Sequence, residues 1–283
     1  MRWIAFVAVV AVALVAAAGT ADAKGSNCVS GDLPCACAAA GGKWRDLKSP
    51  LVPTCTVAIR HQGGERTFNI FFPRTYDAAK KYPVWVHMHG VYWSDMGDIS
   101  KQMGYTVPAS DATPVWDTLA TGPHRDDVII VYPQATSPGG DLTKRTFWSL
   151  PFWRCSVGAC IDAGVDDVGY IEKIFNLLPK RLSVDKTRGM FGTRRRRRDR
   201  GSGAAGGGRL LQTEEQLAEI YLTGTSAGGM MLENLLCTSS VIPNKVAAAV
   251  DIIGGIGAPM RGTCRPAGKR RVPFRILHGE ADQ

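Results

Sequence analysis

Short apolar runs bounded by glycine, proline or charged residues recur along the chain and predict buried β-strands. They occupy residues 82–90, 127–133, 220–222, 247–253 and 274–279. Continuous apolar runs of this length are typical of parallel strands that are covered on both faces. Two earlier segments, residues 56–60 and 66–73, flank the pair Gly63-Gly64 and predict two strands joined by a tight turn.

A helical period replaces this pattern after Asp166. Apolar side chains then recur mostly at spacings of three and four, at Val168, Ile171, Ile174, Phe175, Leu178 and Leu182. This spacing predicts an amphipathic helix. Asp166 and Asp167 stand at its N-terminal end, where carboxylates accept amide N–H groups and oppose the helix dipole. This capping interpretation is favoured over a catalytic one, which stays open.

A second helix is predicted over residues 230–237, directly after a glycine-rich turn. Strands and helices therefore alternate along most of the chain. Such alternation indicates an α/β fold in which a mostly parallel sheet is covered by helices on both faces.

The first 23 residues read as a secretory signal peptide. Met1-Arg2 is followed by an apolar stretch from Trp3 to Ala18 and by the small-x-small pattern Ala21-Asp22-Ala23. A transmembrane anchor is the alternative, but this stretch is shorter than the roughly 20 residues that a spanning helix needs. We expect a secreted, extracellular protein with no membrane attachment.

Eight cysteines follow the predicted signal peptide, at positions 28, 35, 37, 55, 155, 160, 237 and 264. An even number in an oxidising compartment predicts disulfides, and zinc is the weaker alternative because the spacing does not form a metal knuckle. We predict the bridges Cys155–Cys160 and Cys237–Cys264. The first four cysteines should pair among themselves. Residues 24–54 should form a stapled N-terminal extension that precedes the main domain of residues 55–283.

Residues 189–219 break the alternation of strands and helices. They hold the basic run 194–198 and several glycines, and they separate a predicted helix from the strand at Ile220. A structureless loop of this length is uncommon inside a compact domain. We expect a disordered insertion, either a natural surface loop or translated non-coding sequence. Much of the basic density behind the net charge of +9 lies in this run. Such a run can bind nucleic acid, but the expected secretion argues against that role, so no nucleic-acid partner is expected.

The candidate chemistry begins at Ser226. The segment from Gly224 to Gly228 fits the pattern G-x-S-x-G, with an apolar run before it and a predicted helix after it. In that context the serine is a nucleophile on a tight strand-to-helix turn, and the glycines avoid clashes there. The N–H of Ala227, at the positive end of the helix, would bind an oxyanion.

Two further motifs lie at the ends of predicted strands. His87-Met88-His89-Gly90 ends an early strand, and the loop after it would supply a second oxyanion donor at the N–H of Val91. A metal pair formed by His87 and His89 is the weaker alternative, because nothing nearby completes a site. We expect no cofactor and no metal.

An acidic residue after the last strand would complete the machinery as the triad acid. Asp282 is the preferred candidate and Glu280 the second choice, and His278 is expected to be structural.

These motifs together resemble those of the secreted feruloyl-esterase and poly(3-hydroxybutyrate)-depolymerase-like esterases. The resemblance also includes Arg66-Thr67-Phe68, Trp148, the run DDVGYI at residues 166–171 and the run HGEAD at residues 278–282. Those enzymes are α/β-hydrolases. The resemblance implies Ser226 as nucleophile, Asp282 as triad acid, and oxyanion donors at Ala227 and near Val91. Trp148 and Trp153 would line a substrate pocket, and packing in the core or at its rim is an equal alternative for both.

The resemblance also implies a triad histidine several dozen residues after the acid. All five histidines precede Asp282, and the sequence given ends at Gln283. We therefore expect a C-terminally incomplete hydrolase domain that hydrolyses esters very weakly or not at all in this form. The expected activity of the family is hydrolysis of feruloylated or acetylated plant cell-wall polysaccharide, or of a polyester, by a monomer. A catalytically impaired relative that only binds such ligands is the alternative.

Overall fold

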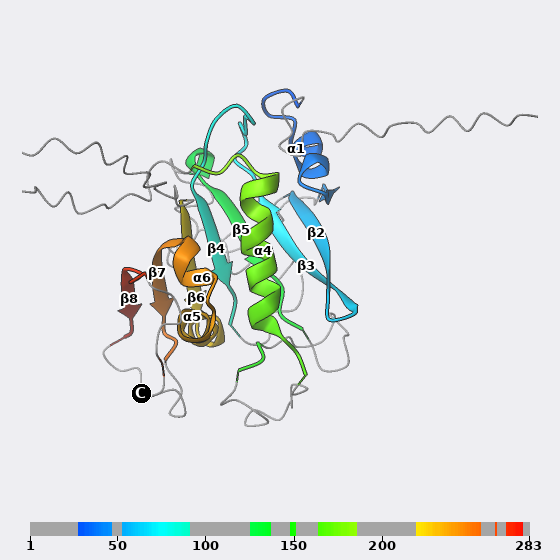
Figure 1. The fold of residues 1–283 in the computed structure, drawn as a ribbon. Helices are drawn as coiled ribbons and strands as arrows, with labels where there is room; N and C mark the ends of the chain where they lie inside the picture. The colour runs from blue at the N-terminus through cyan, green and yellow to red at the C-terminus, as the bar shows by residue number, and fades with distance from the viewer. Residues whose placement is uncertain are drawn as a thin grey trace, which may run out of the picture.

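The computed structural model shows one eight-stranded mixed sheet with helices packed against it (Figure 1). The strand order is β1-β2-β3-β5-β4-β6-β7-β8. The structure describes residues 28–46, 53–90, 125–136, 148–150, 164–185, 219–255, 264 and 270–279.

The antiparallel half of the sheet comes from the N-terminal part of the chain. Strand β1 (Gly42–Arg45) pairs with β2 (Thr54–His61), and β2 forms a hairpin with β3 (Gly64–Phe71). The hairpin turn holds Gln62 and Gly63 at φ values of 49° and 79°, so the predicted glycine turn is confirmed. Strand β3 then runs antiparallel to β5, which joins this half to the rest of the sheet.

The parallel half contains the five remaining strands. They are β4 (Val84–Met88), β5 (Ile129–Pro133), β6 (Ile220–Thr225), β7 (Val246–Ile252) and β8 (Phe274–Leu277). The chain passes from β4 to β5 in one direction along the sheet and then from β6 to β8 in the other. The strand order therefore reverses between β4 and β6, and ligands of doubly wound sheets bind at the carboxyl ends beside such a reversal.

One face of the sheet is covered by a layer of helices. Helix α4 (Asp167–Arg181) follows the predicted amphipathic pattern, with Ile171, Ile174 and Phe175 buried against the sheet. Helix α5 (Ala227–Thr238) lies beside α4. The Ser239 hydroxyl, at the C-terminal cap of α5, donates to Glu172 of α4 at 2.6 Å. The short helix α6 (Ile242–Lys245) contacts both. Residues 91–124, which connect β4 to β5, lie outside the described part of the chain.

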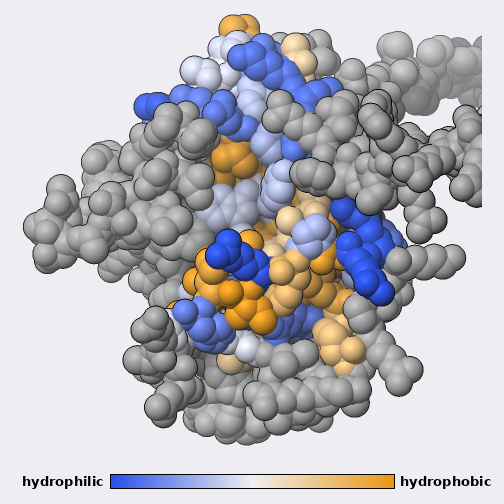
Figure 2. Space-filling view, turned by 90° about the vertical axis from the view of Figure 1, so that its left-hand side faces the viewer, coloured by the Kyte–Doolittle hydropathy of each residue, from blue (hydrophilic) through white to orange (hydrophobic). Residues whose placement is uncertain are grey.

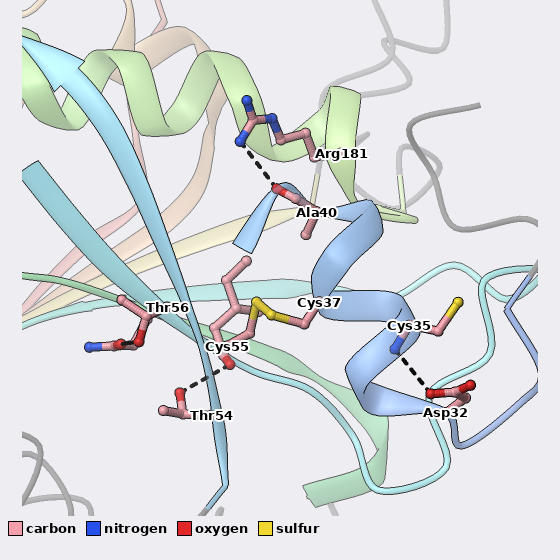
Figure 3. The surroundings of a disulfide bond; sticks show 10 residues. Asp32, Cys35, Cys37, Ala40, Thr54, Cys55, Thr56 and Arg181 are labelled. Atoms are coloured by element: carbon pink, nitrogen blue, oxygen red, sulfur yellow. Dashed lines mark hydrogen bonds between the residues drawn. A yellow bond between two sulfur atoms is a disulfide. The ribbon is translucent and has the colours of Figure 1, made fainter. Parts of the chain in front are cut away.

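The N-terminal extension is more than the stapled appendage that its composition predicts. The first four cysteines do pair among themselves, with Cys28–Cys35 inside the extension and Cys37–Cys55 joining it to β2 of the main domain. However, the segment also forms helix α1 (Leu33–Ala39) and adds β1 to the sheet. Cys37 is fully buried in the main core, and Arg181 of α4 donates to the Ala40 carbonyl at 3.1 Å (Figure 3). The extension is therefore built into the same domain.

Two further predictions needed correction in detail. Residues 274–279 were expected to form a buried strand, but every residue of β8 is exposed, with Ile276 at 51%. Apolar character alone did not reveal its place at the edge of the sheet. Glu219, predicted to be the last residue of the insertion, is buried, and its carbonyl accepts from Val84.

The described residues nearest to the ends of the predicted insertion, Asp185 and Glu219, meet in space. The N–H of Glu219 donates to the Asp185 carbonyl at 2.6 Å, so the residues between them leave and rejoin the domain at one point. Within the described residues no helix is long and apolar enough to span a membrane. The predicted signal peptide (residues 1–23), the body of the insertion (residues 189–218) and Cys155–Cys160 lie outside those residues.

Candidate active site

Ser226 has the backbone conformation of a nucleophile elbow. It connects β6 to α5 with φ 53° and ψ −120°, a region that residues other than glycine rarely adopt. The conformation is held in place because the Ser226 N–H donates to the Ile252 carbonyl of β7, and the Ser226 carbonyl accepts from Met230. Strain of this kind persists only where the surrounding structure enforces it.

The glycines on either side of Ser226 are required by close backbone approach. A Cβ on Gly224 would overlap the backbone of Gly228, and a Cβ on Gly228 would overlap the carbonyls of Met88 and His89. The second contact brings the start of α5 against the end of β4. The predicted turn is thus formed, and the two glycines have the roles that the pattern G-x-S-x-G assigns to them.

The fold class follows from the position of this turn in the sheet. The elbow follows β6 beside the reversal of strand order, and Gly228 of the following helix packs on β4. The chain has the α/β-hydrolase fold. The N–H of Ala227 is among the first amides of α5, which have no acceptor within the helix, and it lies at the positive end of the helix dipole. It can therefore donate to an oxyanion formed at Ser226.

The loop after β4 is anchored by His89. Its Nδ1 lies 2.6 Å from the Gly90 carbonyl, and its Nε2 accepts from the Ala135 N–H at 3.1 Å. Nδ1 must therefore carry the proton and the ring is neutral, in agreement with burial that lowers its pKa to about 4. His89 thus orients the backbone that leads to Val91, the predicted second oxyanion donor, which lies outside the described residues.

Trp148 supports the same loop from its other side. Its indole is fully buried, its Nε1 donates to the His89 carbonyl at 2.7 Å, and its ring packs on the imidazole of His89. The packing alternative considered for this residue therefore has direct support. Its place in a substrate pocket stays a prediction, and Trp153 lies outside the described residues.

The pair Asp166-Asp167 divides into two roles. Asp166 caps α4 by accepting from the Gly169 N–H at 2.7 Å, as predicted. Asp167 is not a cap: it is buried, it accepts from Arg66 at 2.7 Å, and it accepts from the Ser149 N–H. Arg66 also donates to the Gln134 carbonyl and stacks on the ring of Tyr170.

This buried ion pair links the segments that surround the candidate site. Gln134 follows β5, and Ser149 is next to Trp148. Burial raises the pKa of Asp167, while the guanidinium of Arg66 and the Ser149 N–H act to lower it. Arg66 and Asp167 therefore fix residues 134–136 and 148–150 against β3 and α4, at the same end of the sheet as His89.

Three of the described histidines have hydrogen-bond partners other than Ser226. His61 contacts the Asp166 carbonyl, and His87 lies 2.7 Å from the Thr223 hydroxyl with a pKa that burial lowers to about 3. His87 and His89 thus have separate partners, and no group of three metal-ligating side chains occurs among the described residues. The predicted acid Asp282 and its alternative Glu280 lie outside them.

Two buried acidic residues, which sequence reasoning missed, lie on α5 and β7, the helix and the strand next to the elbow. Glu233 of α5 and Asp251 of β7 are both buried, and their carboxyl groups interact. One oxygen on each, Glu233 Oε2 and Asp251 Oδ2, has no donor among the described residues, which is satisfied if the pair shares a proton. Burial first, and the charge of Asp251 next, raise the pKa of Glu233 to about 7.

Stability should therefore fall as the pH rises through the range in which Glu233 loses its proton. Because the folded state holds that proton up to about pH 7 and the unfolded chain releases it near 4.5, the fold is favoured at the lower end. Arg270 lines the same pocket as Glu233, and the interaction with His278 acts to lower the pKa of Asp251. We expect Glu233→Gln, a neutral mimic of the protonated acid, to flatten the dependence of Tm on pH between 5 and 8. An unchanged slope would contradict the shared proton.

Comparison with known proteins finds similar solved structures at low identity only. No protein-family model and no curated protein matches the chain. Among solved structures it is similar to a thermostable esterase, with 18% identity over 81% of this chain and 47% of that one, and a TM-score of 0.40. A ferulic acid esterase (17%, 71% and 58%, TM-score 0.37) and an S-formylglutathione hydrolase from Agrobacterium tumefaciens (13%, 84% and 79%, TM-score 0.45) are also similar.

The chain spans about half of the length of the first two of these structures. At such identities and TM-scores the site has to be judged on its own geometry.

Proposed function

We propose that the protein is a serine esterase that hydrolyses carboxylic esters through an acyl-enzyme. The observation that carries the proposal is the conformation of Ser226. A serine at φ 53° and ψ −120°, between two glycines that cannot carry a Cβ, is costly and has no structural use that a glycine would not serve better. Its value is to present the hydroxyl at the carboxyl edge of the sheet, beside a free helix N-terminus.

The reaction has two steps. Ser226 Oγ attacks the ester carbonyl while its proton passes to a base, and the Ala227 N–H stabilises the negative oxygen of the tetrahedral intermediate. The base then gives its proton to the departing alcohol, which leaves an acyl group on Ser226, and water releases that acyl group as the carboxylic acid by the same route. Asp282 is the proposed acid that orients the base, and Val91 the proposed second oxyanion donor.

Secretion is part of the proposal. Three disulfides, Cys28–Cys35, Cys37–Cys55 and Cys237–Cys264, are present in the described residues and are compatible with an oxidising compartment. The last of them agrees with the sequence prediction. Feruloylated or acetylated xylan and polyhydroxyalkanoates are the proposed substrate classes, because the sequence resembles enzymes that act on them.

A binding protein without turnover is the second candidate function. The observation that favours it is that His61, His87 and His89 make their hydrogen bonds to groups other than Ser226. Such a protein would keep the elbow and the pocket, and would bind an ester or a polysaccharide.

Turnover of p-nitrophenyl acetate and methyl ferulate separates the two candidates. The 283-residue chain and a chain extended by any open reading frame downstream should be compared. Hydrolysis by either chain that Ser226→Ala removes supports the esterase. Saturable binding of methyl ferulate without hydrolysis by both chains supports the binding protein and contradicts the esterase.

A further inference from the structure

Ile253 is held in a conformation that its side chain disfavours. It follows β7 with φ 50°, in the left-handed region where a β-branched residue is a clear outlier. Only three described residues other than glycine have positive φ, and the other two have evident reasons. Gln62 sits in the hairpin turn before Gly63, and Ser226 forms the elbow.

The backbone at Ile253 is fixed on both sides. Its N–H donates to the Leu277 carbonyl at the end of β8 at 2.8 Å, and the following N–H, of Gly254, donates to the buried carboxylate of Asp251 at 2.9 Å. Just before it, the Ile252 carbonyl accepts from Ser226 at 2.9 Å. The strained residue is therefore joined directly to the elbow, at the carboxyl edge of the sheet where ligands of this fold class bind.

Burial does not compensate for this strain, because Ile253 is 46% exposed. Its hydrogen-bonding neighbour Leu277 is also an exposed apolar residue. Phe274 and Ile276 are exposed as well, but the alternation of a strand turns them to the opposite face of β8. Figure 2 views the molecule from the side of β8 and shows apolar residues gathered there. A glycine or asparagine would satisfy the backbone at position 253 at lower cost, so the apolar side chain itself is the feature that needs an explanation.

We propose that Ile253 is a specificity-determining residue, which contacts the apolar group of an ester bound at Ser226 on the β7 side. The proposal rests on the esterase function proposed above and narrows its substrates to esters with an alkyl or aryl group that extends over Ile253. The contact is apolar and has no charged partner, so it favours longer alkyl or aryl groups over acetyl. Backbone strain at a binding site is a known way of holding a side chain in a position that relaxed geometry would not give.

The test uses whichever of the two chains compared above hydrolyses p-nitrophenyl acetate, with the variants Ile253→Gly and Ile253→Ala. Each variant is assayed for kcat/KM on p-nitrophenyl acetate, butyrate and octanoate and on ethyl, butyl and benzyl acetate. One series varies the acyl group and the other varies the alcohol. In one of the two series, Ile253→Gly should lower the ratio of kcat/KM for the longest group to kcat/KM for the shortest group by about 10-fold. Because glycine accepts positive φ, the same variant should raise Tm by about 2–4 °C. Ile253→Ala should change the preference without that rise.

Two matched controls separate strain from contact. Gln62→Gly relaxes a similar φ in the distant hairpin and should raise Tm with no change in preference. Ile276→Ala shortens a more exposed isoleucine with ordinary φ on β8 and should leave the preference unchanged. Ester turnover with the same preference in wild type and Ile253→Gly would overturn the inference alone. No turnover by the wild type would overturn both the inference and the proposed function, and a fall in Tm for Ile253→Gly would remove its basis in strain.

Discussion

Ser226→Ala should reduce ester hydrolysis by about 10⁵–10⁶-fold in a form of the protein that turns over p-nitrophenyl acetate. The loss is large because the nucleophile has no substitute, and only the oxyanion donors and substrate binding would remain. The variant should fold normally, because the Ser226 hydroxyl has no hydrogen bond that supports the turn among the described residues. Its Tm should therefore lie close to that of the wild type.

The matched control for this substitution is Ser240→Ala. Ser240 is an exposed serine just beyond the end of α5, and its carbonyl, not its hydroxyl, accepts from Asn244. It should keep full activity. Ser226→Gly gives an independent check, since it should be as inactive as Ser226→Ala but more stable, because glycine removes the strain at φ 53°. Residual turnover in Ser226→Ala within 10-fold of the wild type would show that another residue attacks the ester.

The largest effect on stability is expected at the buried pair of Arg66 and Asp167. Asp167→Ala leaves the Arg66 guanidinium in the interior with no counter-charge, which should lower the free energy of unfolding by about 3–5 kcal/mol. The Ser149 N–H also loses its acceptor. Urea unfolding followed by tryptophan fluorescence measures the change.

The double variant Arg66→Met with Asp167→Leu should recover much of that loss, because two apolar side chains of similar volume leave no charge unpaired. The exposed pair of Arg74 and Asp126 is the control, and Arg74→Ala should cost no more than about 1 kcal/mol. Equal costs for Asp167→Ala and Arg74→Ala would contradict the role given to the buried pair.

The strands and the main helices could be predicted from the sequence because each is a local pattern. The apolar runs at residues 82–90 and 127–133 contain β4 and β5, and the helical spacing after Asp166 corresponds to α4. The elbow was also predictable, because the pattern G-x-S-x-G specifies the backbone of a single turn. Its strain was then seen directly at Ser226.

Other features depend on pairings between distant segments, which local patterns do not report. Arg66 and Asp167 are 101 residues apart, so their ion pair has no local signal, and Asp167 was read as part of a cap. Glu233 and Asp251 look like surface residues of a helix and a strand until the two elements are packed together. The exposure of β8 and the positive φ of Ile253 likewise follow from position in the sheet, not from composition.

The central claim, that Ser226 is an activated nucleophile, is tested most directly by covalent labelling. The full-length protein would be treated with a fluorophosphonate, digested and analysed by mass spectrometry, with Ser226→Ala as the control. We expect one phosphonylated serine, in the peptide that contains Ser226, and no label in the variant. An unlabelled Ser226 in the folded full-length protein, or a label that persists in Ser226→Ala, would contradict the claim.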